Sequence, residues 1–204
     1  MERSEHDERY LSSEEEALLL RIARDALTAW VGERKHIDLE AYPLTTALRE
    51  RHGAFVTLHA GDELRGCIGY TANQTPLAET VRDNALNAAS RDHRFQPVEP
   101  HELPHITIEI SALCPGDTPD TPFKRVHDVG EILIGRDGLY IERAGDRGGL
   151  LLPQVASERN WDVPRFLEAV CQKAGYPTNA WQDPAYRLYR FSAQVFFESD
   201  RGHE

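Results

Sequence analysis

Two hairpin-like segments constrain the fold of this chain more than any other feature of its sequence. The first, AFVTLHAGDELRGCIGY at residues 54–70, contains two apolar runs separated by a turn with glycine. The second, LYIERAGDRGGLLLP at residues 139–153, has the same character. Each is followed by a helical pattern and then by a strand pattern, HITIEISAL or YRLYRFSAQVFFE. This order predicts an α+β fold, with a mainly antiparallel sheet and flanking helices.

The two hairpins also indicate an internal duplication. Aligning them sets Ala60-Gly61-Asp62 against Ala144-Gly145-Asp146, and it places Leu151 opposite Cys67. The alternative is that AGD is merely a frequent turn tripeptide. Duplication of a hairpin–helix–strand unit and chance similarity of two turns both stay open.

The chain length suits one domain with two unequal lobes. We expect a single domain at 12–197, lobes at 12–114 and 123–197, and flexible termini at 1–11 and 198–204.

A long amphipathic helix is expected at the start of the domain. Its start fits a capping box formed by Ser12 with Glu15 or by Ser13 with Glu16.

Charge and composition exclude several classes of protein. The formal net charge is −11 and no Lys/Arg-rich run occurs, so we expect no nucleic-acid partner. No apolar run approaches the length of a membrane span, and the charged N-terminus is unlike a signal peptide. Three widely spaced cysteines indicate free thiols, so we expect a cytoplasmic protein.

The motif LRGCIG, residues 64–69, is the strongest candidate for a functional site. In a regular strand, Arg65, Cys67 and Gly69 share one face, and Leu64, Gly66 and Ile68 share the other. A guanidinium about 6 Å from the sulfur would lower the thiol pKa by about half a unit to two units and favour the nucleophilic thiolate. Glycines inside a strand indicate close approach of a backbone or a ligand.

Other residues add candidate chemistry around this motif. Glu109 lies on the polar face of HITIEISAL, and three roles stay open for it: a pair with Arg65, an acid or base beside the thiol, or simply a solvent-facing side chain. A dyad of Cys67 with His59 or with His93 is a further alternative. The histidines and cysteines lack metal-ligand spacing, and there is no phosphate-binding glycine loop, so we expect no metal and no cofactor.

Five stretches make a family resemblance recognisable: ELRGCIGY, PLAETVRDNALNAASRDHRF, ELPHITIEISAL, GLLLPQVA and FLEAVCQKAG. In this order they resemble the AMMECR domain family, known in microbes as AmmeMemoRadiSam system protein A, over roughly residues 12–197. The resemblance implies a two-lobed α+β fold, an intracellular protein, a cleft beside LRGCIG, and Memo-like and radical-SAM proteins as partners. By position it carries over Leu64, Arg65, Gly66, Cys67, Ile68, Gly69, Glu109 and Gln154. His93 departs from the proline that the family commonly has there.

Three functions follow from these observations. The preferred one is a binding or adaptor component, whose cleft around LRGCIG takes a small-molecule or peptide ligand or one of those partners. The second is an enzyme that uses Cys67 as nucleophile or redox thiol, assisted by Arg65 and Glu109. The third assigns LRGCIG a purely structural role.

Overall fold

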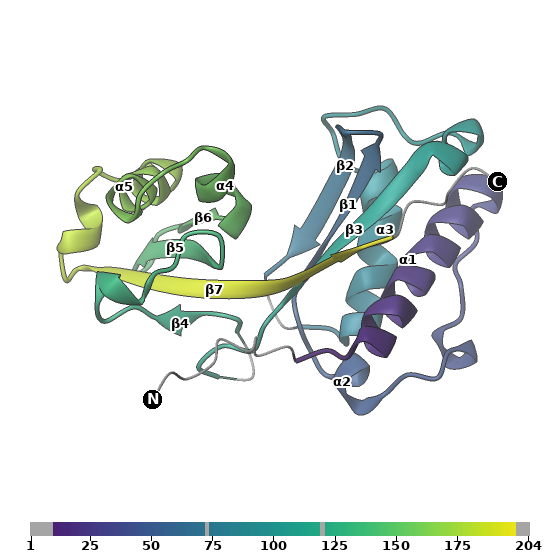
Figure 1. Ribbon diagram of the computed structural model, residues 1–204, viewed down its shortest axis with the longest axis horizontal. Helices are drawn as coiled ribbons and strands as arrows, with labels where there is room; N and C mark the ends of the chain where they lie inside the picture. The colour runs from purple at the N-terminus through teal and green to yellow at the C-terminus, as the bar shows by residue number, and fades with distance from the viewer. Residues whose placement is uncertain (1–9, 72–73, 119–120, 199–204) are drawn as a thin grey trace. The chain divides into compact units, whose positions relative to one another are not determined.

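The computed structural model describes residues 10–71, 74–118 and 121–198, and the chain divides into two units (Figure 1). The first comprises the chain up to Ala112 together with the chain from Gln194 onward, and the second comprises Leu113–Ala193. The termini expected to be flexible lie mostly outside the described residues. Leu11, at the end of the expected flexible N-terminus, does lie within the described residues. Its side chain is buried, and its N–H donates to the Gln194 amide oxygen over 3.2 Å.

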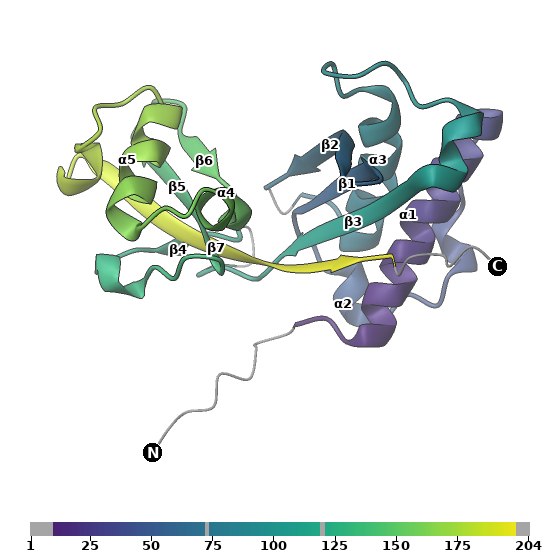
Figure 2. The same cartoon turned by 45° about the horizontal axis from the view of Figure 1, so that its top comes forward.

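In the first unit, helices cover one face of an antiparallel sheet with strand order β2-β1-β3-β7 (Figure 2). The elements are α1 (Ser13–Glu33), α2 (Thr46–Arg49), β1 (Ala54–Ala60), β2 (Glu63–Tyr70), α3 (Leu77–Ser90), the 3₁₀ helix η2 (Pro100–His105), β3 (Ile106–Leu113) and the end of β7 (Tyr186–Phe197). Val56, Leu58 and Ile108 are fully buried in the core shared with α1 and α3. The alternate side chains Thr57 and Glu109 are half-buried on the opposite face.

Helix α1 begins at the capping box of Ser12 and Glu15. The Ser12 hydroxyl accepts from the Glu15 N–H (3.3 Å), and the Glu15 carboxylate accepts from the Ser12 N–H (2.8 Å). The structure therefore selects this pair over Ser13 with Glu16. From there Leu19, Ile22 and Ala26 recur at helical spacing and are buried, which fixes the face that α1 turns to the core.

The second unit repeats the order hairpin, helix, strand. Its elements are β4 (Lys124–Arg125), η3 (Val129–Glu131), β5 (Asp137–Arg143), β6 (Gly149–Leu151), α4 (Pro153–Glu158), α5 (Val163–Lys173), η4 (Ala180–Gln182) and most of β7. Strand β5 pairs antiparallel with β6 and β7. Leu139, Ile141 and Phe166 form the centre of its core.

These units confirm the predicted α+β class and its antiparallel sheet. Gly61 and Gly145, the aligned turn glycines of the two hairpins, both have positive φ (61° and 87°), a conformation that glycine adopts readily. The shared turn geometry has this local cause, so the internal duplication stays a prediction.

Among the described residues, no helix has the length and apolar composition needed to cross a bilayer.

Candidate functional site

The LRGCIG motif lies on β2, the edge strand of the first unit's sheet. A β-bulge interrupts its pairing with β1: His59 pairs with Leu64, and Leu58 pairs with Gly66, so Arg65 is the extra residue. The regular alternation expected from the sequence is therefore wrong at Leu64. That side chain lies opposite His59 and is 40% exposed, whereas Gly66 is buried.

The two glycines of the motif accommodate other parts of the protein. A β-carbon added at Gly66 would overlap the carbonyl oxygen of Ala88, so the backbone of α3 lies directly on this residue. A β-carbon at Gly69 would overlap the Phe55 ring. Ile68 is half-buried against the core of the first unit. A glycine inside a strand indicates close approach of either a backbone or a ligand. For Gly66 the close approach of a backbone is thus confirmed.

Arg65 is anchored by hydrogen bonds on three of its nitrogens. Its Nε and Nη2 donate to the two carboxylate oxygens of Glu102 in η2 (2.7 and 3.0 Å), and its Nη1 donates to the Gln96 carbonyl (3.0 Å). Only 17% of the Arg65 side chain and 25% of the Glu102 side chain are exposed. Arg65 therefore pairs with Glu102 rather than Glu109, and its charge is already compensated by a carboxylate.

Cys67 belongs to a row of polar side chains across three strands. The pairing places Thr57 of β1 directly between Cys67 of β2 and Glu109 of β3. The Thr57 hydroxyl donates to the Cys67 sulfur over 3.3 Å. The structure therefore gives this sulfur a hydroxyl partner, a residue that the sequence analysis did not name.

Burial raises the pKa of the Cys67 thiol above its ordinary value, and the negative charges of Asp92 and Glu109 add to this rise. The Thr57 hydrogen bond and the charge of Arg94 lower this pKa, but they offset only part of the increase. Arg65 could make Cys67 substantially ionised only if burial did not act in the opposite direction. Here desolvation dominates, and Glu102 already pairs with Arg65.

Asp92 and Arg94, in the segment after α3, hold the edge of β2 at Cys67. The Asp92 carboxylate is almost fully buried, and it accepts from the Cys67 N–H (2.9 Å). The same carboxylate accepts from Nε and Nη2 of Arg94 (2.9 and 2.6 Å). The Arg94 side chain is 49% exposed, so it is the more accessible of the two arginines beside the motif.

Replacing Asp92 with asparagine is expected to lower the free energy of unfolding by about 2 kcal/mol at pH 7, because charge-assisted hydrogen bonds are lost. Arg94 and the Cys67 N–H hold the pKa of Asp92 well below its usual range. A lowered folded-state pKa stabilises fully above about pH 5, and this contribution declines as the pH falls below about 4. Urea unfolding at pH 7 and pH 3 should show the difference between wild type and variant shrinking at the lower pH. A difference independent of pH would contradict this account.

Glu109 faces His59 instead of an arginine. The His59 Nε2 lies 3.3 Å from the Glu109 Oε2, but the two atoms are not aligned for a hydrogen bond. Nε2 is buried and has no hydrogen-bond partner within the part of the chain that the structure describes. His59, Gly61, Thr107, Glu109, Phe197 and Glu198 line a pocket of about 260 Å³. The site therefore continues from Cys67 through Thr57 to a pocket at Glu109.

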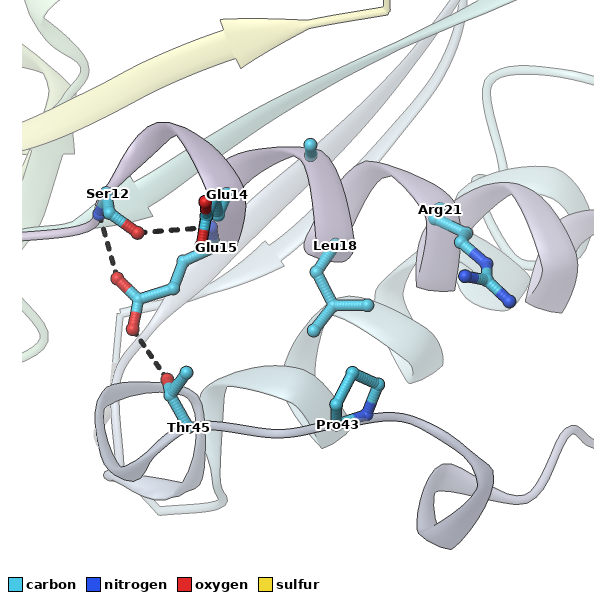
Figure 3. Close-up of a pocket in the computed structure, with 8 residues that line it drawn as sticks. Ser12, Glu14, Glu15, Leu18, Arg21, Pro43 and Thr45 are labelled. Atoms are coloured by element: carbon cyan, nitrogen blue, oxygen red, sulfur yellow. Dashed lines mark hydrogen bonds between the residues drawn. The ribbon is translucent and has the colours of Figure 1, made fainter.

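A second pocket of the first unit, about 450 Å³, lies beside the start of α1 (Figure 3). Its polar groups bind one another: Glu15 accepts from the Thr45 hydroxyl (2.5 Å) while it completes the capping box with Ser12. Leu18 and Pro43 supply apolar contact area. These bonds join α1 to the segment before α2, and they account for Ser12, Glu15 and Thr45 without a ligand.

Gln154, carried over from the resemblance, lies in α4 of the second unit. Its side-chain Oε1 is buried without a hydrogen-bond partner among the described residues. The other site residues, Leu64 to Gly69 and Glu109, all belong to the first unit. The three cysteines form no disulfide bond with one another. Over residues 10–71, 74–118 and 121–198, no group of three His, Cys, Asp or Glu side chains is arranged to hold a metal ion.

Sequence reasoning missed the groups that surround the motif. Glu102 lies 37 residues from Arg65, and no spacing rule joins them. Thr57 could have been found by counting across the hairpin, but an unbulged count pairs it with Gly66 instead of Cys67. Asp92 and Arg94 do carry a signal, because RDHRF concentrates charges directly after a helix.

Comparisons with known proteins agree with this fold. The AMMECR1 family model matches residues 20–196. A protein of Methanothermobacter thermautotrophicus is 42% identical over 188 residues, covering 92% of this chain and 96% of that protein. A protein of Methanopyrus kandleri is 42% identical over 193 residues, covering 93% and 91%.

A solved structure is also similar. The crystal structure of the uncharacterized protein PH0010 from Pyrococcus horikoshii has a TM-score of 0.76 and 36% sequence identity, and the match covers 89% of this chain and 90% of that one. The similarity extends over almost the whole of both chains, at an identity that shows common ancestry. The chain belongs to the AMMECR1 family.

Proposed function

We propose that this protein is a binding component, which recognises a peptide or small-molecule ligand through the half-exposed sheet face formed by Cys67, Thr57 and Glu109. As the family resemblance suggests, its partners are Memo-like and radical-SAM proteins, which it meets inside the cell. The observation that carries the proposal is the compensated electrostatics of the motif. Arg65 is bound by Glu102 and Gln96, and burial raises the pKa of Cys67.

A protonated thiol suits recognition better than nucleophilic attack, because the thiolate is the reactive form of cysteine. The thiol offers a polarisable contact and a weak hydrogen bond. Beyond Thr57 the face presents a carboxylate at Glu109, and the pocket there is lined by the exposed ring of Phe197. Together these groups form a mixed polar and aromatic surface, of the kind found at protein interfaces.

A thiol enzyme is the second candidate, and one observation favours it. The Thr57 hydroxyl and the positive charge of Arg94 both lower the pKa of Cys67, although burial outweighs them. In this alternative Glu109, whose charge acts on the thiol, is the acid or base. Substrate binding must then offset the rise in the Cys67 pKa that burial causes.

Calorimetry with Memo-like and radical-SAM proteins from the same organism tests the binding proposal. We expect at least one of them to bind the wild-type protein, and Cys67→Ala to weaken that binding about tenfold, or about 1.4 kcal/mol. Cys114→Ser, at a cysteine of the second unit, is the matched control and should bind as wild type. Absence of binding to both partner types, or equal affinity of wild type and Cys67→Ala, would refute the proposal.

A further inference from the structure

The pocket at Glu109 lies at one end of the recognition face, as we call the half-exposed sheet face formed by Cys67, Thr57 and Glu109. It is lined from the end of β1, from β3 and from the end of β7, all within the first unit. Its volume of about 260 Å³ suits a single side chain better than a whole cofactor.

One of the two carboxylates in the lining is already neutralised. Glu198 accepts from Nε of Arg24 (2.9 Å), from Nη2 of the same arginine, and from the Ile108 N–H (3.1 Å). Arg24 in turn donates to the carbonyls of Leu103 and Ile106 (3.3 and 2.6 Å), so its charge is fully engaged. The pocket therefore takes its negative character from the remaining carboxylate, Glu109.

Glu109 retains capacity to accept hydrogen bonds. A carboxylate has two oxygens with about four lone-pair positions. The His59 imidazole approaches one of these oxygens without hydrogen-bond geometry. About a quarter of the Glu109 side chain (26%) is exposed, so a ligand can reach the carboxylate from the pocket.

An aromatic ring lies in the same pocket. Phe197 ends β7 and is 66% exposed, while its neighbour Phe196 is buried in the core, as strand alternation requires. A phenylalanine at this exposure contributes little to folding. The face of an aromatic ring attracts cations, most often an arginine guanidinium, and a nearby carboxylate strengthens this preference.

We propose that this pocket binds the guanidinium of an arginine side chain of the partner, with a bidentate ion pair to Glu109 and stacking on Phe197. The inference rests on the proposed function, because Glu109 belongs to the recognition face. Guanidinium geometry matches a carboxylate in two parallel hydrogen bonds, which the point charge of an ammonium cannot do. The net charge of −11 favours approach of a basic segment.

The test is an NMR titration of the full-length protein with N-acetyl-arginine amide. N-acetyl-citrulline amide, of similar shape but uncharged, is the matched ligand. We expect the arginine compound to bind with a dissociation constant of about 1–10 mM, to shift resonances of residues that line the pocket, and to bind at least about tenfold more tightly than citrulline. Equal affinities for the two compounds, or shifts confined to other residues, would overturn the inference.

Variants assign the two interactions. Glu109→Gln should weaken arginine binding about tenfold and Phe197→Leu about threefold, whereas Glu14→Gln, in the pocket beside α1, should leave it unchanged. Thermal unfolding of each variant verifies that it is folded. Unchanged arginine binding by folded Glu109→Gln would overturn the inference. N-acetyl-lysine amide bound as tightly as the arginine compound would also overturn it, in favour of a general cation site.

Partner binding separates this inference from the proposed function. If Glu109→Gln binds the partner as wild type does while Cys67→Ala does not, the arginine pocket is refuted and the recognition face stands. If neither substitution weakens partner binding, the recognition face itself is refuted. Loss of partner binding in both variants supports the two proposals together.

Discussion

Replacing Gly66 with alanine is expected to lower the free energy of unfolding by about 3 kcal/mol, the upper part of the usual range for overpacking. The added methyl group would overlap the carbonyl oxygen of Ala88, a backbone atom that moves only if α3 moves. Urea unfolding monitored by circular dichroism measures the loss. Unfolding at the wild-type urea concentration would show that α3 does not lie on this strand.

Gly32→Ala is the matched control for that substitution. Gly32 is exposed in α1, and a β-carbon added there meets nothing within 4 Å. Alanine is a better helix former than glycine, so this variant should be more stable by up to about 1 kcal/mol. Opposite signs for the two substitutions would show that the loss at Gly66 arises from its contact with α3.

Breaking the pair of Arg65 and Glu102 is expected to have the second largest effect. Arg65→Gln and Glu102→Gln should each cost about 2–3 kcal/mol, because each leaves a largely buried charge without its partner. A double-mutant cycle should show a coupling energy of about 1–2 kcal/mol. The exposed pair Arg165 and Glu168 of the second unit is the control, and its coupling should stay below about 0.5 kcal/mol.

The coupling between Arg65 and Glu102 should also depend on pH. The Arg65 hydrogen bonds lower the pKa of Glu102 from its ordinary value. A carboxyl group with a lowered folded-state pKa stabilises the fold fully above about pH 5 and progressively less as the pH falls below about 4. A cycle repeated at pH 3 should give a smaller coupling energy. A coupling near zero at pH 7 would mean that Arg65 is free to bind a ligand.

Much of the fold could be predicted from periodicity alone. Ile106, Ile108 and Ile110 alternate with polar residues, and the structure buries all three. The sequence predicts that α1 starts at one of two capping boxes, which differ in position by a single residue. Such signals are local, because each depends on residues within one or two helical turns or along one strand. Elements of this kind can therefore be predicted without knowing the tertiary fold.

The site could be predicted only in part, because its geometry depends on one bulge. With regular pairing from the turn at Gly61, Thr57 would lie opposite Gly66, and Cys67 would face the core. The bulge at Arg65 shifts the register by one residue and places Cys67 beside Thr57 and Glu109. Sequence reasoning located the motif but assigned Arg65 to the thiol. The actual partners, Glu102 for Arg65 and Arg94 for the Cys67 thiol, come close only through the tertiary fold.

The pH dependence of Cys67 alkylation tests the central claim most directly: this thiol is protonated and serves recognition. Iodoacetamide labelling rates, read for the peptide that contains Cys67 by mass spectrometry, separate this residue from Cys114 and Cys171. Because burial raises its pKa, Cys67 should show an apparent pKa above about 8.5. An apparent pKa below about 8.5 would contradict the account and support Cys67 as a nucleophile.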